Sequence, residues 1–196
     1  MRCYWLVPKD NRRNNWILYD GGRKGIAVRE QYRDLCCSQC GKLDEGRAIA
    51  RGLDEDLRLK TTFDINTTDD GFVYFKCDIW HQLVTLGVHG VSTIPIPGDR
   101  EHLLVVPDPR LEIDVDVARS GTQFHRQCPQ CGRFRETTFF PMLESIALPS
   151  DPLQIGVPSL RQENIRGRVF WLIATETVVG HLKDLRAKGL EYLEVQ

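Results

Sequence analysis

Short runs of alternating apolar and polar residues recur along the chain and predict β-strands rather than long helices. Glycine, proline, asparagine and aspartate separate most of these runs, as expected for turns between strands. Strands are predicted at residues 4–7, 16–19, 26–28, 72–75, 91–96, 103–106, 111–117, 137–140, 169–174 and 190–195. Residues 44–60 form a charged, weakly helical segment, and a proline-containing loop is expected at residues 141–168.

Apolar residues at a spacing of three or four predict two amphipathic helices. The first begins at Asp78, a residue type that commonly caps helix N-termini, and Gly87 and Gly90 end it. The second begins at Thr175 or Thr177 and ends at Gly189. Their apolar faces consist of Ile79, Leu83 and Leu86 in the first helix, and of Val178, Leu182 and Leu185 in the second. Each helix lies between two predicted strands, which indicates two strand–helix–strand units.

These two units resemble each other at an offset of 99 residues. The offset aligns Leu83, Leu86, Gly90, Val91, Ile94 and Ile96 with Leu182, Leu185, Gly189, Leu190, Leu193 and Val195. Shared helix and strand periodicities alone can produce such matches, but a C-x-x-C-G motif also precedes each unit and favours an internal duplication. We therefore expect an α+β fold in which residues 1–196 form one compact domain. Its similar halves, at about 1–106 and 107–196, would be joined by a four-cysteine zinc site.

The two C-x-x-C-G motifs, at residues 37–41 and 128–132, carry the clearest chemistry. In such a zinc knuckle the two sulfurs lie on one side of a tight turn. The glycines, Gly41 and Gly132, adopt a backbone conformation that other residues resist, so that amide N–H groups can point at the thiolates. Four thiolates leave no position for water, and the expected site is therefore a single structural Zn²⁺. Its expected ligands are Cys37, Cys40, Cys128 and Cys131.

Basic residues follow both motifs. Lys42, Arg133 and Arg135 are close enough in sequence to offset the surplus negative charge of four thiolates on Zn²⁺. Solvated surface positions explain these three residues equally well. Cys36 adjoins the first motif and is expected to be a spectator, whereas His125 stands just before the second motif and could replace one thiolate.

The composition is that of an ordinary globular protein, with 41% hydrophobic and 27% charged residues. A formal net charge of −1 provides no overall basic field for nucleic acid. Seven cysteines, an odd number, favour a reducing cytoplasm and bound metal over a secreted disulfide scaffold. The N-terminal segment has too few apolar residues for a signal peptide, and the best apolar run, residues 169–174, is too short for a membrane span. We therefore expect a cytoplasmic protein.

Motifs of the common enzyme classes are not found. A zinc-dependent nucleobase deaminase needs a His-x-Glu element, and none of the five histidines belongs to one. A glycine directly after each C-x-x-C is unlike the helix that begins at this motif in thioredoxins. The chain also lacks a phosphate-binding glycine-rich loop and a G-x-S-x-G elbow, and Asp114 and Asp116 offer only weak support for a carboxylate pair. The sequence therefore favours a non-enzymatic protein with no small-molecule substrate.

The two motifs, about ninety residues apart, and the closing segment LIATE at residues 172–176 with its helix and strand resemble the double-CXXCG motif family. That family is bacterial and includes immunity proteins of the swarming-inhibition toxin systems of myxobacteria. The resemblance extends from the first motif to the end of the chain. It implies a cytoplasmic, metal-binding, non-enzymatic protein that binds and neutralises a cognate toxin.

A cluster of acidic residues offers a candidate surface for such a protein partner, because it would complement the basic site of a nuclease. A solvated acidic loop explains the same residues more simply. The cluster consists of Asp54, Glu55, Asp56, Asp64, Asp69 and Asp70. Two other functions stay open from the sequence: a zinc-ribbon-like nucleic-acid or regulatory module, and a thiol-based redox or metal-sensing protein.

Overall fold

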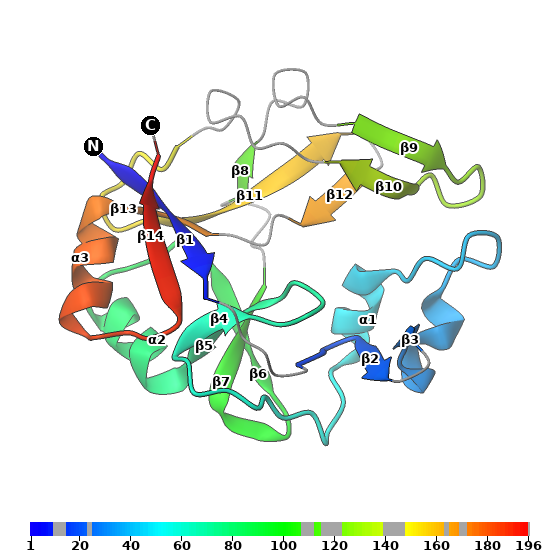
Figure 1. Cartoon of the computed structure of the whole chain (residues 1–196), viewed down its shortest axis with the longest axis horizontal. Helices are drawn as coiled ribbons and strands as arrows, with labels where there is room; N and C mark the ends of the chain where they lie inside the picture. Colours follow the sequence, from blue (N-terminus) through cyan, green and yellow to red (C-terminus); the bar gives the residue numbers. More distant parts are fainter. Residues whose placement is uncertain are drawn as a thin grey trace.

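The computed structural model describes residues 1–9, 15–22, 25–106, 112–114, 123–138, 148–162, 165–168 and 172–195. It is a mixed α+β structure with small sheets and few helices (Figure 1), which confirms the predicted fold class. The strands are β1 (Cys3–Pro8), β2 (Tyr19–Gly22), β3 (Gly25–Val28), β4 (Ile65–Thr67), β5 (Val73–Lys76), β6 (Ser92–Ile96), β7 (Asp99–Val106), β8 (Glu112–Asp114), β9 (Gln123–Gln127), β10 (Phe134–Thr138), β11 (Ile155–Gln162), β12 (Ile165–Arg168), β13 (Leu172–Thr175) and β14 (Leu190–Glu194). The helices are the 3₁₀ helix η1 (Glu30–Leu35), α1 (Glu45–Arg51), α2 (Cys77–Thr85) and α3 (Glu176–Asp184). Within the described residues, no helix combines the length and the apolar character that crossing a membrane requires.

The strands form two larger sheets and two separate hairpins. One sheet has the order β4-β5-β7-β6, with every neighbouring pair antiparallel. The other has the order β12-β11-β13-β1-β14. Its sixth strand, β8, pairs in parallel with β11 and lies outside this order. The hairpins are β2–β3 and β9–β10. Both ends of the chain lie in the same sheet, where β1 and β14 run side by side (Figure 1).

The two strand–helix–strand units have the same pattern of pairing. In the first unit α2 connects β5 to β6, and both strands pair with β7. In the second unit α3 connects β13 to β14, and both strands pair with β1. However, β7 follows its unit in the chain, whereas β1 is the first strand and lies far from its unit in sequence. The predicted halves 1–106 and 107–196 therefore stay a prediction, because β1 pairs with strands of the second range.

Both helices begin directly after a strand. In α3, Thr175 is the N-cap, and its hydroxyl accepts a hydrogen bond from the N–H of Val178. In α2 the predicted cap is wrong, because the helix already begins at Cys77 and Asp78 lies in its first turn. Leu86, which was predicted on the buried face, is 43% exposed because it lies beyond the last helical residue.

One hydrophobic core is shared by both sheets and by α2 and α3. It consists of Leu6, Ile65, Phe75, Ile79, Trp80, Leu83, Val88, Val91, Val105, Ile155, Leu172, Ala174, Val178, Val179, Leu182 and Leu190. Burial of each large aliphatic or aromatic side chain is worth about 1.5–3 kcal/mol relative to exposure. The two strand–helix–strand units are therefore packed against each other through apolar contacts.

A second core supports the first C-x-x-C-G motif. Its buried members are Ile17, Leu18, Tyr32, Leu35, Leu43, Ala48, Leu53, Leu57, Phe72, Ile96 and Leu104. Leu35 precedes the motif and Leu43 follows it, and both are at most 5% exposed. The core therefore anchors the chain on both sides of the motif.

Of the strand predicted at residues 16–19, only Tyr19 lies in a strand. The backbone N–H groups of Ile17 and Leu18 donate hydrogen bonds to the carboxylate of Asp70, each at 2.8 Å, instead of to a neighbouring strand. As a result, β2 begins only at Tyr19. Apolar side chains at both positions suggested a strand, but the long-range acceptor is not visible in the local pattern.

Two other predicted segments differ from the structure. The helix expected within residues 44–60 is only the short α1, which ends at Gly52 with a φ of 111°. The loop expected at residues 141–168 contains β11 and β12, because its prolines did not prevent pairing with β8 and β13. Parts of three predicted strands, residues 111, 115–117, 139–140 and 169–171, lie outside the described residues.

Asp99 is a buried carboxylate at the start of β7, and we expect its removal to destabilise the protein. It accepts hydrogen bonds from the backbone N–H groups of Leu59, Glu101 and His102, and it lies 3.1 Å from Nδ1 of His102. Burial raises the pKa of Asp99, but these hydrogen bonds outweigh burial and hold the pKa below its usual value. Asp99→Asn should therefore lower the free energy of unfolding by about 1–3 kcal/mol at neutral pH.

The pH dependence of this effect follows from the lowered pKa. A carboxyl group with a lower pKa in the folded protein stabilises it above the unfolded pKa of about 4. The contribution is lost as the pH falls through the folded value. Urea unfolding of wild type and Asp99→Asn should show a stability gap at neutral pH that shrinks towards about pH 3. A gap of equal size at both pH values would contradict this assignment.

Candidate metal centre

The two C-x-x-C-G motifs fold into the same turn. In the first, the N–H of Gly41 donates to the carbonyl of Cys37 at 2.8 Å, and the N–H of Cys37 donates to the carbonyl of Lys42 at 3.0 Å. Residues 128–133 repeat both hydrogen bonds at the equivalent positions, at 2.8 and 2.9 Å. Gly41 and Gly132 have φ values of 72° and 69°, in the left-handed region that glycine tolerates best. The predicted knuckle geometry is therefore present in both motifs.

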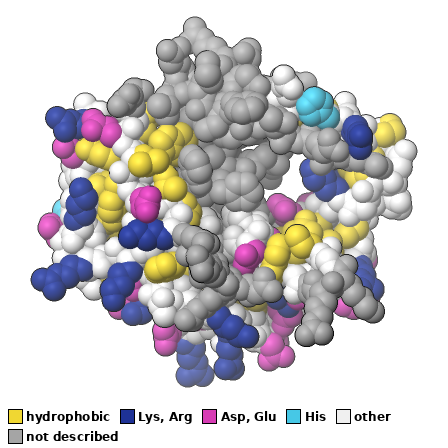
Figure 2. All heavy atoms as spheres, in the orientation of Figure 1, with side chains coloured by type: hydrophobic (Ala, Val, Ile, Leu, Met, Phe, Trp, Pro, Cys, Tyr) yellow, Lys and Arg dark blue, Asp and Glu magenta, His cyan; other side chains and the backbone are white. Residues whose placement is uncertain are grey.

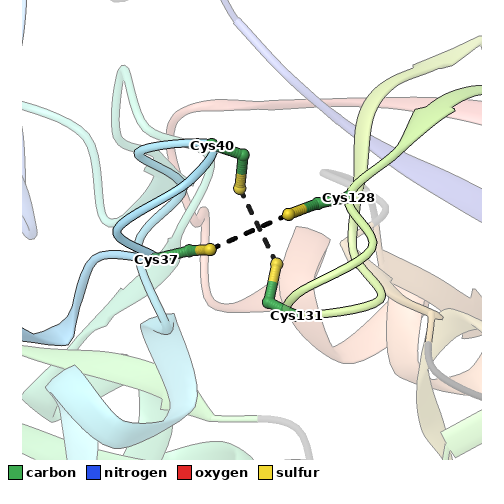
Figure 3. Close-up of side chains that lie close together, drawn as sticks. All are labelled: Cys37, Cys40, Cys128 and Cys131. Carbon is green, nitrogen blue, oxygen red and sulfur yellow. Dashed lines mark hydrogen bonds between the residues drawn. The ribbon is translucent and has the colours of Figure 1, made fainter.

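An antiparallel pair closes each turn. Cys36 and Leu43 form an isolated bridge around the first motif. Gln127 and Phe134, at the equivalent positions, are the innermost pair of the β9–β10 hairpin around the second. Each cysteine pair is therefore held at the tip of a short two-stranded element, with the two tips facing each other (Figure 3).

The four cysteine sulfurs meet between the two turns, although the motifs are far apart in sequence. The Sγ atoms of Cys37 and Cys128 are 3.8 Å apart, and those of Cys40 and Cys131 are 3.7 Å apart (Figure 3). All four sulfurs lie within 4.8 Å of one another. A tetrahedron of sulfurs at a zinc–sulfur distance of about 2.3 Å has edges of about 3.8 Å. The cluster therefore has the size of a tetrahedral four-thiolate metal site.

The thiols of Cys37, Cys40 and Cys131 differ in acidity. Backbone N–H groups of the turn, above all that of Cys40, lower the pKa of Cys37. The N–H of Arg133 lowers the pKa of Cys131 to about 6. The N–H of Lys42 lowers the pKa of Cys40, but desolvation and the neighbouring sulfurs outweigh it and raise that pKa to about 11. A bound divalent cation would supply the positive charge that allows all four sulfurs to ionise together.

Lys42 and Arg133, predicted near the site, both reach across it. The Nζ atom of Lys42 donates a hydrogen bond to the carbonyl of Phe134. The Nη1 atom of Arg133 donates to the carbonyl of Leu43 at 2.6 Å. The structure therefore brings both basic side chains to the metal centre, whereas the side chain of Arg135 lies outside the described residues.

Gln39 and Gln130 also contact the cysteine sulfurs, although neither residue was predicted to belong to the site. The Sγ atom of Cys128 lies 3.6 Å from Oε1 of Gln39, and the Sγ atom of Cys37 lies 3.8 Å from Oε1 of Gln130. The amide of Gln130 also donates to the hydroxyl of Ser38 at 2.9 Å. Both motifs have glutamine directly before the second cysteine, and this repetition in the sequence could have identified the two residues.

Cys36 and His125 are not members of the four-sulfur cluster. The Sγ atom of Cys36 lies 3.9 Å from the carbonyl oxygen of Tyr32. His125 is exposed in β9, where its backbone pairs with Glu136. The sulfurs that the structure brings together are therefore those of the four predicted cysteines.

Most of the predicted acidic cluster has partners within the protein. Asp70 binds the chain at residues 17–18, as described above, and Asp69 accepts a hydrogen bond from the N–H of Asn15 at 2.5 Å. Asp64 accepts from the N–H of Lys188 at 2.9 Å. These three carboxylates have structural roles that sequence alone did not reveal.

The remaining three acidic residues lie together on one loop. Asp54 pairs with Arg29 at 3.3 Å, while Glu55 and Asp56 are exposed. Asp54 and Asp56 line a shallow depression of about 380 Å³, together with Arg29, Trp16 and other residues of both charges. Asp54, Glu55 and Asp56 therefore form an acidic loop. Asp64, Asp69 and Asp70 do not belong to it, because their carboxylates bind backbone N–H groups within the protein.

No protein-family model matches the chain, and the comparisons with curated proteins and with solved structures find no match either. The resemblance to the double-CXXCG family therefore stays an expectation based on the motifs.

Proposed function

We propose that the four cysteines hold one structural Zn²⁺. The observation that carries this proposal is the meeting of four sulfurs, from two motifs far apart in sequence, within 4.8 Å of one another. Zn²⁺ in structural sites prefers tetrahedral coordination by thiolates, and four thiolates leave no position for a reactive water. Such a metal would connect two distant segments of chain, where loop closure is otherwise costly. Its role would be to fix the fold rather than to catalyse a reaction.

We further propose that the fold is an internal duplication, with the metal between the two copies. The bounds of α2, Cys77–Thr85, and of α3, Glu176–Asp184, agree at the offset found in the sequence. The sheet orders β4-β5-β7-β6 and β11-β13-β1-β14 correspond strand by strand, and each copy has its own C-x-x-C-G turn. In this proposal β1 completes the second copy, so the copies are related by a circular permutation.

The proposed biological role is that of a non-enzymatic, cytoplasmic binding protein of the immunity type, which neutralises a cognate toxin. The seven free thiols fit a reducing compartment. The sequence resemblance supports the immunity role. Acidic and basic side chains intermingle on the visible face (Figure 2), which fits a protein partner better than nucleic acid.

The proposed contact surface is the acidic loop, Asp54, Glu55 and Asp56. Glu55 and Asp56 are exposed, and Asp54 and Asp56 line a depression to which Trp16 and Arg29 also contribute. Charged residues at the rim of an interface guide association and favour partners of opposite charge. A basic toxin would therefore meet this loop.

Charge reversal of the acidic loop tests this role. We expect Glu55→Lys with Asp56→Lys to weaken binding to the toxin encoded by the neighbouring gene by about tenfold, mostly through slower association. Glu191→Lys, which changes an exposed acidic residue on β14, should leave binding unchanged. Calorimetric titration of the purified proteins measures the affinity. A neighbouring gene without a toxin-like product, or a product that does not bind, would contradict the immunity role.

A further inference from the structure

Lys42 and Arg133 make the same contact in opposite directions across the metal centre. Lys42 donates to the carbonyl of Phe134, which follows the second motif, and Arg133 donates to the carbonyl of Leu43, which follows the first. Both basic residues stand directly after the glycine of their own motif, so donors and acceptors occupy equivalent positions. Each of the two hydrogen bonds joins one turn to the other, so neither can form unless the two turns face each other.

Both residues place a positive charge beside the cluster. Their acceptors are neutral backbone carbonyl groups rather than carboxylates. Four thiolates around Zn²⁺ carry a formal surplus of two negative charges, and Lys42 and Arg133 supply two positive charges beside it.

We infer that Lys42 and Arg133 form a reciprocal latch that holds the two motifs at coordination spacing and slows release of the metal. The inference rests on the proposed zinc centre. Release of the metal requires one turn to move away from the other, and this movement breaks both latch contacts. Charge-assisted hydrogen bonds are stronger than neutral ones, and residues that orient metal ligands from outside the coordination sphere typically change metal affinity by about 10–100-fold.

The rate of zinc transfer to an excess of a chromophoric chelator tests the latch in the full-length protein. We expect Lys42→Met and Arg133→Met each to release zinc roughly tenfold faster than wild type, and the double variant up to about 100-fold faster. The control is Arg51→Met, which removes an exposed guanidinium that binds Asp34 at 2.6 Å, and it should release zinc at the wild-type rate. Arg133→Lys keeps the charge and should recover part of the wild-type rate.

A second readout separates the latch from the ligands. Co²⁺ bound in place of zinc should give the same four-sulfur absorption spectrum in wild type and in all variants, because no ligand is changed. Lys42→Met changes an exposed side chain and provides the same test if Arg133→Met does not fold. Wild-type protein that binds no zinc would overturn the proposed centre. Wild-type protein that binds zinc, with both methionine variants releasing it at the Arg51→Met rate, would overturn the latch alone.

Discussion

Serine in place of Cys37 or Cys128 is expected to remove the bound metal and most of the stability that it provides. Each substitution leaves three thiolates and a hydroxyl group, which is a much weaker ligand for Zn²⁺. Structural zinc contributes on the order of 10 kcal/mol to the folding of small zinc peptides at neutral pH. Here the large apolar core should retain part of the fold, so we expect a loss of several kcal/mol in the free energy of unfolding.

Cys36→Ser provides the matched control for this prediction. It changes the thiol next to Cys37 without changing a member of the four-sulfur cluster. Zinc analysis and urea unfolding of the three variants, purified in parallel, measure both effects. Cys36→Ser should keep its metal and its stability. Equal metal content in Cys36→Ser and Cys37→Ser would show that the four sulfurs do not form one site.

Alanine at Gly189 is expected to cause the second large effect, because Gly189 lies where the second strand–helix–strand unit contacts β4 of the other sheet. Gly189 has a φ of 111°, and a Cβ atom there would overlap the backbone carbonyl oxygen of Ile65 in β4. The conformation alone costs about 1–3 kcal/mol for a non-glycine residue, and overpacking adds about 1–3 kcal/mol. We therefore expect a total loss of about 4 kcal/mol in the free energy of unfolding.

Gly52→Ala separates these two causes. Gly52 also has a φ of 111°, but a Cβ atom there would meet no other atom within 4 Å. It should therefore show only the conformational cost, whereas Gly189→Ala should show both. The difference in urea midpoint between the two variants measures the steric part. Similar losses in both variants would mean that the strand next to Gly189 moves aside easily.

The features that could be predicted from sequence are those set by short segments. The C-x-x-C-G pattern alone predicts the turn, the glycine conformation and the cysteines whose sulfurs meet, because all of these lie within a few positions. Similarly, the apolar spacing of Val178 and Leu182 predicts the buried face of α3, and both residues are fully buried. The α+β class follows from the same local patterns.

The features that sequence did not reveal depend on contacts between distant segments. Asp70 appeared to be part of an acidic surface, but its carboxylate binds the backbone at residues 17–18. The pairing of β1 with β13 and β14 joins the two ends of the chain, and no local pattern specifies it. The crossing of Lys42 and Arg133 likewise depends on how the two turns face each other. The resemblance between the motifs could predict that they meet, but not which side chains cross.

Zinc X-ray absorption on protein purified without added zinc tests whether both motifs bind one metal ion. We expect about one zinc per chain, surrounded by four sulfur atoms at about 2.3 Å. Protein without metal and with all thiols free would contradict the proposed centre and favour a thiol-based redox role. Zinc bound mainly by nitrogen or oxygen would also contradict it, because the cluster in Figure 3 offers only sulfur ligands.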